Sequence, residues 1–175
     1  MTGSSLPVLF LDVDGPLIPF GATRQQLPDG YPSFDAPGPN PLLSRIDPAL
    51  GPRLRALPCE LVWATTWMSD ANECVAPWLG LPELPAVDWP DPAPDHARGL
   101  HWKTPALVRW AGGRAFAWVD DEITDVDRAW VEAHHPGPAL LHRVEAWRGL
   151  TSADFAALDA WLRRASDRFD GYADT

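Results

Sequence analysis

The chain lacks several features that mark whole classes of protein. It has two cysteines, Cys59 and Cys74, which form no CxxC pair and stand near no histidine at metal-binding spacing, so they favour reduced thiols over disulfides or zinc ligands. No apolar run approaches the roughly 18 residues that span a bilayer. The opening segment MTGSSLPVLF has no basic start and no separate apolar stretch. We therefore expect no signal peptide, no membrane partner and a soluble, cytoplasmic protein.

Positive charge is also scarce. Lysine and arginine number 14 against 24 acidic residues, which gives a net charge of −10 at pH 7. Such a surface repels nucleic acid at long range, so charge disfavours a nucleic-acid partner unless a local basic groove is present. Part of the excess negative charge can instead belong to a metal site. We find no internal repeat, and the sequence leaves the oligomeric state open.

Apolar residues and prolines are abundant instead. With 175 residues, 46% of them apolar, the chain matches a single domain over residues 1–175 with a sizeable core. Many of the 20 prolines fall in residues 16–58 and 77–105, which indicates long ordered loops. Residues 18–46 show no helical or strand period, and loops of this length are usually functional or mobile.

Short apolar runs alternate with helix signals along the whole chain. The run before Asp12 is typical of a buried central strand. The alternation favours an α/β fold, a three-layer sandwich with a central five-stranded parallel sheet. Sites in such sheets lie at the carboxyl ends of the strands. The expected strands are 6–11, 60–65, 84–89, 115–121 and 138–144, and helices are expected after Asp47, after Ser69, from Thr104, over 124–134 and after Thr151.

Two acids, Asp12 and Asp14, follow the first expected strand. Residues i and i+2 of a strand point the same way, about 6.6 Å apart, so Asp12 and Asp14 can face one ligand while Val13 packs behind them. Taken alone, the pair is explained equally well by a turn acid followed by a helix cap.

Three later signals fall on the same edge of the expected sheet. The second strand ends in Thr65 and Thr66, the fourth ends in Asp120 and Asp121, and Lys103 precedes a helix. Converging carboxylates need a counter-charge, which Mg²⁺ supplies beside phosphate, and an amine with a hydroxyl can bind the phosphate itself. Each signal alone has an ordinary structural explanation, but their shared placement favours a phosphate site.

In this order the sequence resembles the haloacid dehalogenase-like (HAD) hydrolase superfamily. The matching segments are LFLDVDGPL, ELVWATT, HWKTPAL and AWVDDE, within residues 6–165. More closely, WATTWMSDAN, HWKTPALV, FAWVDDEIT and LLHRVEAWRGLT resemble the HAD domain of bacterial proteins of the Swiss Army Knife RNA-repair type. Two departures stand out: Pro16 follows Gly15 where a residue with an N–H is common, and the fourth segment lacks a common glycine.

The resemblance implies a Mg²⁺-dependent phosphatase that forms an aspartyl-phosphate. Asp12 would be the nucleophile, ionised at pH 7 if its pKa is ordinary. Asp14 would protonate the leaving group and then activate water. The metal would bind the Asp12 carboxylate, the Asp14 carbonyl oxygen and one acid of the fourth segment, Asp121 in preference to Asp120.

The resemblance also implies how phosphate is bound. Thr65, in preference to Thr66, would supply a hydroxyl, Lys103 would offset negative charge, and backbone N–H groups from Gly15 onward would add donors.

Other side chains near the expected edge have open roles. Trp67 either lines the site, stacks on a base or belongs to the core. Arg148 either binds a second anionic group of the substrate or caps the last helix, and His101 is expected to be structural or solvated.

The substrate stays open between two classes. The chain has no room for a cap domain beyond a small lid at 18–46, and nearly capless relatives act on large substrates such as nucleic-acid ends. The net charge points away from nucleic acid, so a small phosphorylated metabolite remains open. The alternative function is a non-catalytic accessory module that binds metal and phosphate.

Overall fold

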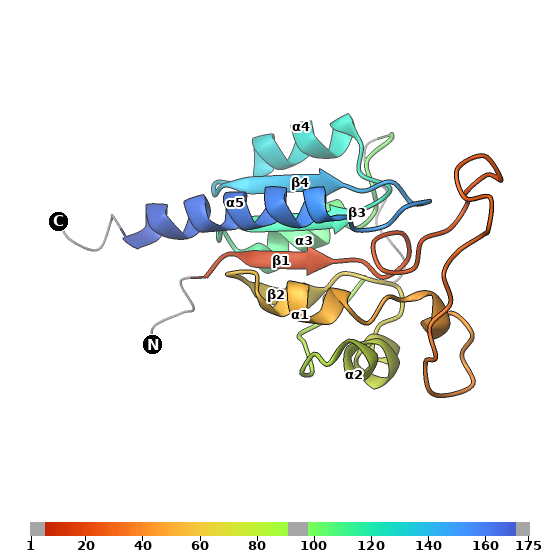
Figure 1. Ribbon diagram of the computed structural model, residues 1–175. Helices are drawn as coiled ribbons and strands as arrows, with labels where there is room; N and C mark the ends of the chain where they lie inside the picture. The colour runs from red at the N-terminus through yellow and green to blue at the C-terminus, as the bar shows by residue number, and fades with distance from the viewer. Residues whose placement is uncertain (1–5, 91–97, 171–175) are drawn as a thin grey trace.

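A parallel sheet forms the centre of the protein. The computed structural model describes residues 6–90 and 98–170 (Figure 1). The sheet has the strand order β2-β1-β3-β4, and every neighbouring pair is parallel, so the expected α/β architecture is confirmed with four strands in place of five. The strands are β1 (Val8–Leu11), β2 (Glu60–Trp63), β3 (Phe116–Asp120) and β4 (Ala139–Arg143).

The third expected strand, 84–89, is reduced to a single bridge beside β2, so the prediction of a fifth strand is wrong. The Trp63 amide donates to the Pro85 carbonyl at 2.8 Å, and the Val87 amide donates to the Trp63 carbonyl at 2.9 Å. The pairing cannot extend backward because Pro85 has no N–H. It does not extend forward because the Thr65 carbonyl accepts the indole N–H of Trp89 instead of a backbone N–H.

Helices cover both faces of the sheet, as the sequence predicts (Figure 1). Because side chains alternate along a strand, Val8 and Phe10 pack with α3 and α4, whereas Leu9 and Leu11 pack with α1, α2 and α5. The α-helices are α1 (Leu50–Arg55), α2 (Ala76–Leu79), α3 (Thr104–Ala111), α4 (Asp125–His134) and α5 (Ser152–Asp170), with a 3-10 turn at Leu43–Arg45 and a π-helical turn at Ala71–Val75.

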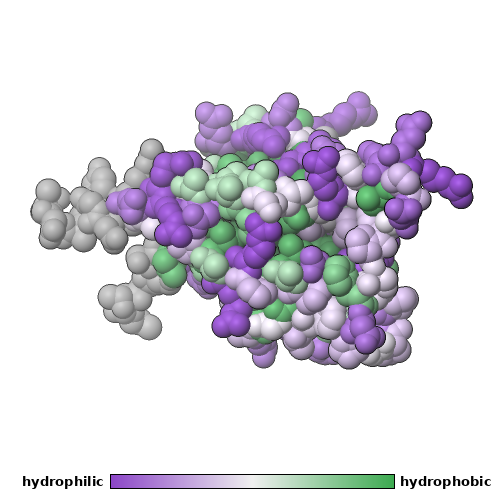
Figure 2. All heavy atoms as spheres, in the orientation of Figure 1, coloured by the Kyte–Doolittle hydropathy of each residue, from purple (hydrophilic) through white to green (hydrophobic). Residues whose placement is uncertain are grey.

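Apolar and hydrophilic residues are distributed unevenly over the surface. On the face shown in Figure 2, apolar residues reach the surface in the middle of the molecule, and hydrophilic residues surround them. Among the described helices, none is both long enough and apolar enough to cross a bilayer.

The long segment 18–46 contains little regular structure but is tied to the body. In Figure 1 it extends beyond the carboxyl ends of the strands. The Phe20 amide donates to the Ala146 carbonyl at 2.8 Å, and the Leu150 amide donates to the Pro16 carbonyl at 2.9 Å. These bonds attach the start of the segment to the turn between β4 and α5.

One buried carboxylate, that of Asp127, fixes the start of α4 and the approach to α3. Its Oδ2 accepts the amide and the hydroxyl of Thr124, both at 2.8 Å. The bond from the Thr124 amide, together with one from the Asp127 amide to the Thr124 side chain, forms a capping box. Its Oδ1 accepts the His101 amide at 2.8 Å and the Thr104 hydroxyl at 2.7 Å. Burial alone would raise the pKa of Asp127, but these hydrogen bonds outweigh it and hold the pKa below its usual range.

We expect Asp127→Ala to lower the free energy of unfolding by about 2–3 kcal/mol at pH 7, since it removes a cap and leaves buried donors unpaired. A carboxylate with a depressed folded-state pKa stabilises the fold above its unfolded pKa of about 4, and this stabilisation is lost as the pH falls. The gap between wild type and variant in urea unfolding should therefore shrink in acid.

Asp125→Ala is the matched control, because the Asp125 side chain lies in the same helical turn but is 99% exposed. It should cost much less stability than Asp127→Ala. Equal losses in the two variants would contradict the role assigned to Asp127.

Candidate active site

The acid after β1 and the acid at the end of β3 lie close together because of the strand register. Leu11, which ends β1, pairs with Trp63 of β2 and with Val119 of β3. Asp12 therefore follows β1 at the level where Asp120 ends β3, and the Asp12 amide donates to the Val119 carbonyl at 3.1 Å. The carboxyl ends of two neighbouring parallel strands place both acids at one edge, as the sequence predicts.

Lys103, immediately before α3, joins these two strand ends. Its Nζ lies 2.9 Å from Asp12 Oδ2 and 2.9 Å from Asp120 Oδ2. The lysine is 3% exposed and Asp120 is fully buried. Attraction to the two carboxylates raises the pKa of Lys103 above its ordinary value although burial opposes this, so the amine stays charged.

The negative charges at this edge exceed the positive ones. Asp12, Asp120 and Asp121 each offer a carboxylate oxygen, and these oxygens lie within 4.8 Å of one another. Burial raises the pKa of Asp12 to about 7, with Lys103 opposing the rise and Asp120 adding to it. Burial and Asp120 raise the pKa of Asp121 to about 6. The expectation of an ordinary Asp12 pKa is therefore wrong, and this donor set fits a hard divalent cation.

Gly15 is the point where the chain passes this acidic cluster. Its φ of +94° lies in the left-handed region, and a Cβ there would approach Asp121 Oδ1 to 2.6 Å. The Gly15 amide donates to the Ile18 carbonyl at 3.0 Å. The expected role of this amide in phosphate binding is therefore not supported, because the N–H is already engaged in the turn that follows β1.

Asp14 receives a hydrogen bond from Trp67. The indole Nε1 donates to Asp14 Oδ2 at 3.1 Å, and the Trp67 amide donates to Thr65 Oγ1 at 3.2 Å. The next residue, Met68, has a φ of +51°, a strained value for a residue with a side chain. Of the roles open to Trp67, the structure shows that its polar edge contacts an acid of the site.

A cavity of about 230 Å³ opens over the acids. Three of its lining residues, Phe20, Trp102 and Glu122, were not predicted from the sequence. Trp102 and Glu122 neighbour Lys103 and Asp121 in the chain, which is the one local signal for them. The cavity is lined by Asp12, Asp14, Phe20, Thr66, Trp102, Lys103, Asp121 and Glu122.

Of the remaining expected residues, Thr66 lines this cavity, whereas Thr65 and Arg148 do not. Thr66 lines the cavity and is exposed, whereas Thr65 is 2% exposed and does not line it. The preference for Thr65 over Thr66 stays a prediction. Arg148 does not line this cavity; its guanidinium lies 4.5 Å from the centre of the Trp147 ring, in the turn after β4.

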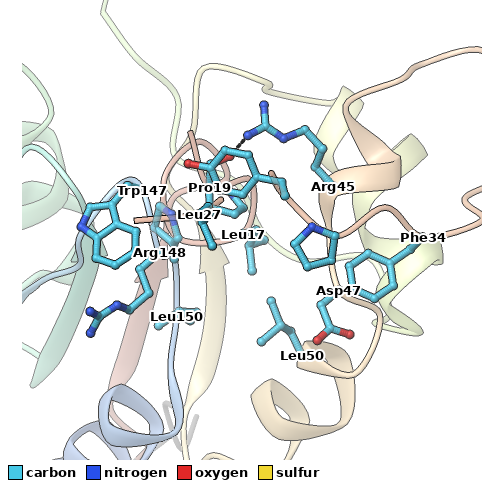
Figure 3. A pocket seen from close by; sticks show the side chains of 14 residues that line it. Leu17, Pro19, Leu27, Phe34, Arg45, Asp47, Leu50, Trp147, Arg148 and Leu150 are labelled. Carbon is cyan, nitrogen blue, oxygen red and sulfur yellow. Dashed lines mark hydrogen bonds between the residues drawn. The ribbon is translucent and has the colours of Figure 1, made fainter. Parts of the chain in front are cut away.

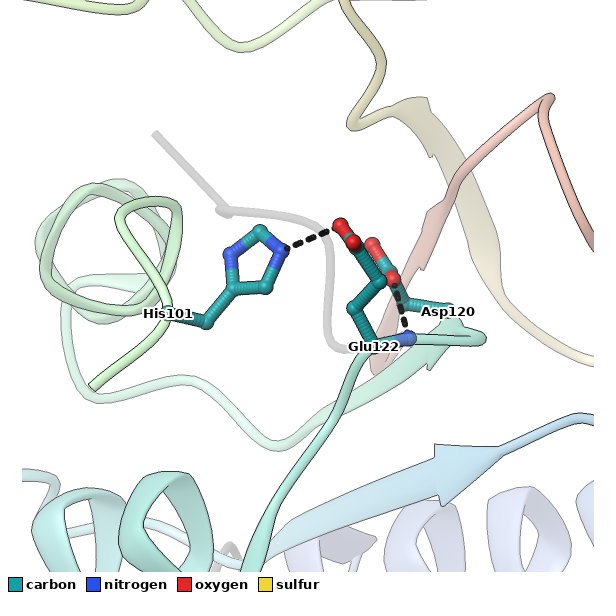
Figure 4. A group of neighbouring side chains, drawn as sticks. All are labelled: His101, Asp120 and Glu122. Carbon is teal, nitrogen blue, oxygen red and sulfur yellow. Dashed lines mark hydrogen bonds and ion pairs between the residues drawn. The ribbon is translucent and has the colours of Figure 1, made fainter. Parts of the chain in front are cut away.

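His101 contacts two residues that line the cavity, Lys103 and Glu122, and Figure 4 shows its contact with Glu122. Its Nδ1 accepts the Lys103 amide at 3.1 Å, and its Nε2 lies 3.2 Å from Glu122 Oε2. Since Nδ1 is an acceptor, the neutral ring carries its proton on Nε2 and donates it to Glu122. His101, Asp120 and Glu122 lie close enough to hold an ion, but this tautomer directs an N–H rather than a lone pair at them.

Comparison with known families and proteins gives one match. A family model described as the HAD domain in Swiss Army Knife RNA repair proteins matches residues 8–155. No curated protein and no solved structure matches the chain.

Two glycine substitutions test the contact between Gly15 and Asp121. Gly21 has a similar φ of +80° with no atom within 4 Å of a new Cβ, so Gly21→Ala should cost only the backbone strain, about 1–2 kcal/mol. Gly15→Ala must in addition displace the Asp121 carboxylate. We expect it to lose more stability in chemical unfolding and to bind divalent cations more weakly in calorimetric titration. Equal behaviour of the two variants would contradict this close contact.

Proposed function

The chain belongs to the family of HAD domains in Swiss Army Knife RNA repair proteins, and from that premise we propose that it is a phosphatase that hydrolyses phosphate monoesters with Mg²⁺. The observation that carries the proposal is the buried Lys103 ammonium held 2.9 Å from both Asp12 and Asp120, with Asp121 beside them. This arrangement supports the proposal because one sheet edge then holds a nucleophile, a set of carboxylates for a cation and a positive charge for the phosphate.

The residues that would hold the cation are Asp12, Asp121 and the carbonyl of Asp14, with Asp120 behind them. Oxygen donors of this kind suit Mg²⁺. When bound, the ion would neutralise negative charge on the phosphoryl oxygens. The carboxylates themselves supply the reason for a cation, since burial and, less strongly, the neighbouring Asp120 raise the pKa values of Asp12 and Asp121.

In the first half-reaction, a carboxylate oxygen of Asp12 attacks phosphorus, and the bond from phosphorus to the leaving oxygen breaks. Protonated Asp14 gives its proton to that oxygen, which departs as an alcohol. Lys103 stays beside Asp12 and offsets the charge that builds on the phosphoryl group. Asp12 then carries an aspartyl-phosphate, and Asp14 is ionised.

In the second half-reaction, water attacks the phosphorus of the aspartyl-phosphate. Asp14 accepts the proton of that water, and the bond from phosphorus to the Asp12 oxygen breaks. Phosphate leaves, Asp12 is regenerated as a carboxylate and Asp14 is again protonated. Thr66 on the cavity surface and Thr65 behind it, together with Lys103, are the groups that we assign to phosphate binding.

Trp67 has a positioning role in this scheme. An indole N–H can only donate, so it directs Asp14 Oδ2 toward Trp67 in either protonation state of the acid. The transferable proton is then held on Oδ1. The strained backbone at Met68 lies directly after this contact, where strain of that kind tends to serve function.

Turnover of 4-nitrophenyl phosphate by the wild type should require Mg²⁺ and stop when the metal is chelated. Asp12→Asn should lower kcat by at least about a thousandfold, because it removes the nucleophile. Asp35→Asn, an exposed acid in the 18–46 segment, is the control for a neutralised carboxylate. A wild type that turns over no phosphate ester with any divalent metal, at mildly acidic, neutral and mildly basic pH, would favour the accessory binding module instead.

Trp67→Phe keeps the ring but removes the N–H donor. Because proton donation matters most for poor leaving groups, we expect kcat/KM for an alkyl phosphate to fall about 10–100-fold. The loss for 2,4-dinitrophenyl phosphate, whose leaving group needs no proton, should be much smaller.

Trp78→Phe is the matched control, since the Trp78 indole donates to the Ile46 carbonyl at 2.9 Å, away from the acids. It should show no such dependence on the leaving group. An equal loss on both substrates in Trp67→Phe would mean that Trp67 is structural and does not position Asp14.

A further inference from the structure

Lys103 is the one cationic side chain among the described residues that line the cavity over the acids, which we call the acidic cavity. Arg148, the other candidate for phosphate binding, lines a separate cavity beside Trp147 (Figure 3). The positive charge available to the phosphoryl group therefore depends on how well Lys103 is held. A lysine has a flexible four-carbon stem, so its ammonium keeps one position only where contacts fix it.

The backbone end of this lysine is held by His101. The Lys103 amide donates to His101 Nδ1 at 3.1 Å, and the His101 amide donates to the buried Asp127 carboxylate at 2.8 Å. The imidazole side chain is 7% exposed. Its ring centre lies 5.6 Å from that of Trp102 and 5.4 Å from that of Trp118. The ring is therefore fixed by packing as well as by hydrogen bonds.

The other nitrogen of the same ring leads back to the charged end of Lys103. His101 Nε2 donates to Glu122 Oε2 at 3.2 Å, and the Glu122 amide donates to Asp120 Oδ1 at 2.9 Å (Figure 4). The second oxygen of that carboxylate, Asp120 Oδ2, accepts from Lys103 Nζ at 2.9 Å. A closed loop of hydrogen bonds therefore connects the backbone amide of Lys103 to its own ammonium.

This loop matters most once Asp12 has reacted. Before the reaction the Lys103 ammonium is shared between Asp12 and Asp120, each 2.9 Å away. When an oxygen of Asp12 bonds to phosphorus, that carboxylate gives up its negative charge, and Asp120 remains as the anionic partner of the pair. His101 and Glu122 make no bond to the phosphoryl group, so their hydrogen bonds are available in both half-reactions.

We propose that His101 is a positioning residue of the phosphatase, which keeps the Lys103 ammonium beside the phosphoryl group while Asp12 carries it. It acts through the two contacts of its ring, one to the Lys103 amide and one, by way of Glu122, to Asp120. This inference rests on the proposed phosphatase activity and adds a residue that does not line the acidic cavity. A purely structural histidine would do no more than pack against its aromatic neighbours and satisfy one N–H group before α3.

Two substitutions separate these roles. His101→Asn places an oxygen where Nδ1 accepts the Lys103 amide but loses the ring, whereas His101→Phe keeps a ring against Trp102 and Trp118 but has no nitrogen. We expect His101→Phe to lower kcat for 4-nitrophenyl phosphate at least about tenfold, and His101→Asn to retain most of kcat although it unfolds at a lower temperature. A structural role predicts the reverse order, in which kcat follows the packing.

His101→Gln takes the place of His101→Phe if the latter does not fold. Its amide nitrogen reaches toward the position of Nε2, but the Lys103 amide loses its acceptor, so kcat should fall as in His101→Phe. The loss should be the same for an alkyl phosphate and for 2,4-dinitrophenyl phosphate, because Lys103 acts on the phosphoryl group and not on the leaving oxygen.

His142→Phe and His142→Asn are the matched controls. His142 Nε2 contacts Asp154 Oδ1 at 2.8 Å, so this is another histidine paired with a carboxylate, and it does not line the acidic cavity. Neither control should lower kcat. Equal kcat in wild type and in the variants that lack an acceptor for the Lys103 amide, or a greater loss in His101→Asn than in those variants, would overturn the proposal.

A binding measurement separates this inference from the proposed activity. Beryllofluoride with Mg²⁺ bonds to a carboxylate oxygen and mimics an aspartyl-phosphate, so it probes the occupied state of Asp12 without turnover. Its dissociation constant in calorimetric titration should rise at least about tenfold in His101→Phe and stay near the wild-type value in His101→Asn.

That result supports the role of His101 even if no phosphate ester is hydrolysed, in which case only the phosphatase proposal fails. Hydrolysis of 4-nitrophenyl phosphate with unchanged kcat and unchanged beryllofluoride binding in His101→Phe leaves the phosphatase standing and removes the role of His101. A wild type that neither hydrolyses phosphate esters nor binds beryllofluoride removes both.

Discussion

The site depends on one buried cation, the Lys103 ammonium between Asp12 and Asp120. Without it, the ends of β1 and β3 would bring two buried carboxylates together with no compensating charge, and removing one partner of a buried pair typically costs about 3–5 kcal/mol. The same residue directly precedes α3, and His101 and Asp127 hold the segment that leads into this helix. The charge balance at the sheet edge and the packing of α3 and α4 are therefore linked.

The sequence predicts those parts of the site that local pattern and topology determine. Asp12 and Asp120 could be brought together from strand ends alone, since parallel strands share one edge. Lys103 could be added to that edge because it directly precedes an expected helix. The prediction of a fifth strand is wrong because a tertiary contact prevents the pairing from continuing. The Trp89 indole donates to the Thr65 carbonyl, which a longer strand pair would need as an acceptor. The use of the Gly15 amide by Ile18 and the placement of Arg148 away from the acids depend on turn geometry that no periodicity encodes.

The 18–46 segment does not act as a simple cover over the acids. Among the residues that line the acidic cavity, Phe20 is its one contribution, whereas several residues of the segment, among them Pro19, Leu27 and Phe34, line a second cavity beside the turn after β4.

The central claim is that Asp12 carries the phosphoryl group during turnover. The most direct measurement incubates Asp14→Asn with 2,4-dinitrophenyl phosphate and Mg²⁺, quenches in acid and maps phosphorylated peptides by mass spectrometry. Because this variant lacks the group that activates water, the intermediate should accumulate, and the account predicts one phosphoryl group on Asp12. A phosphoryl group on another residue, or phosphate release with no covalent species at any time, would contradict it.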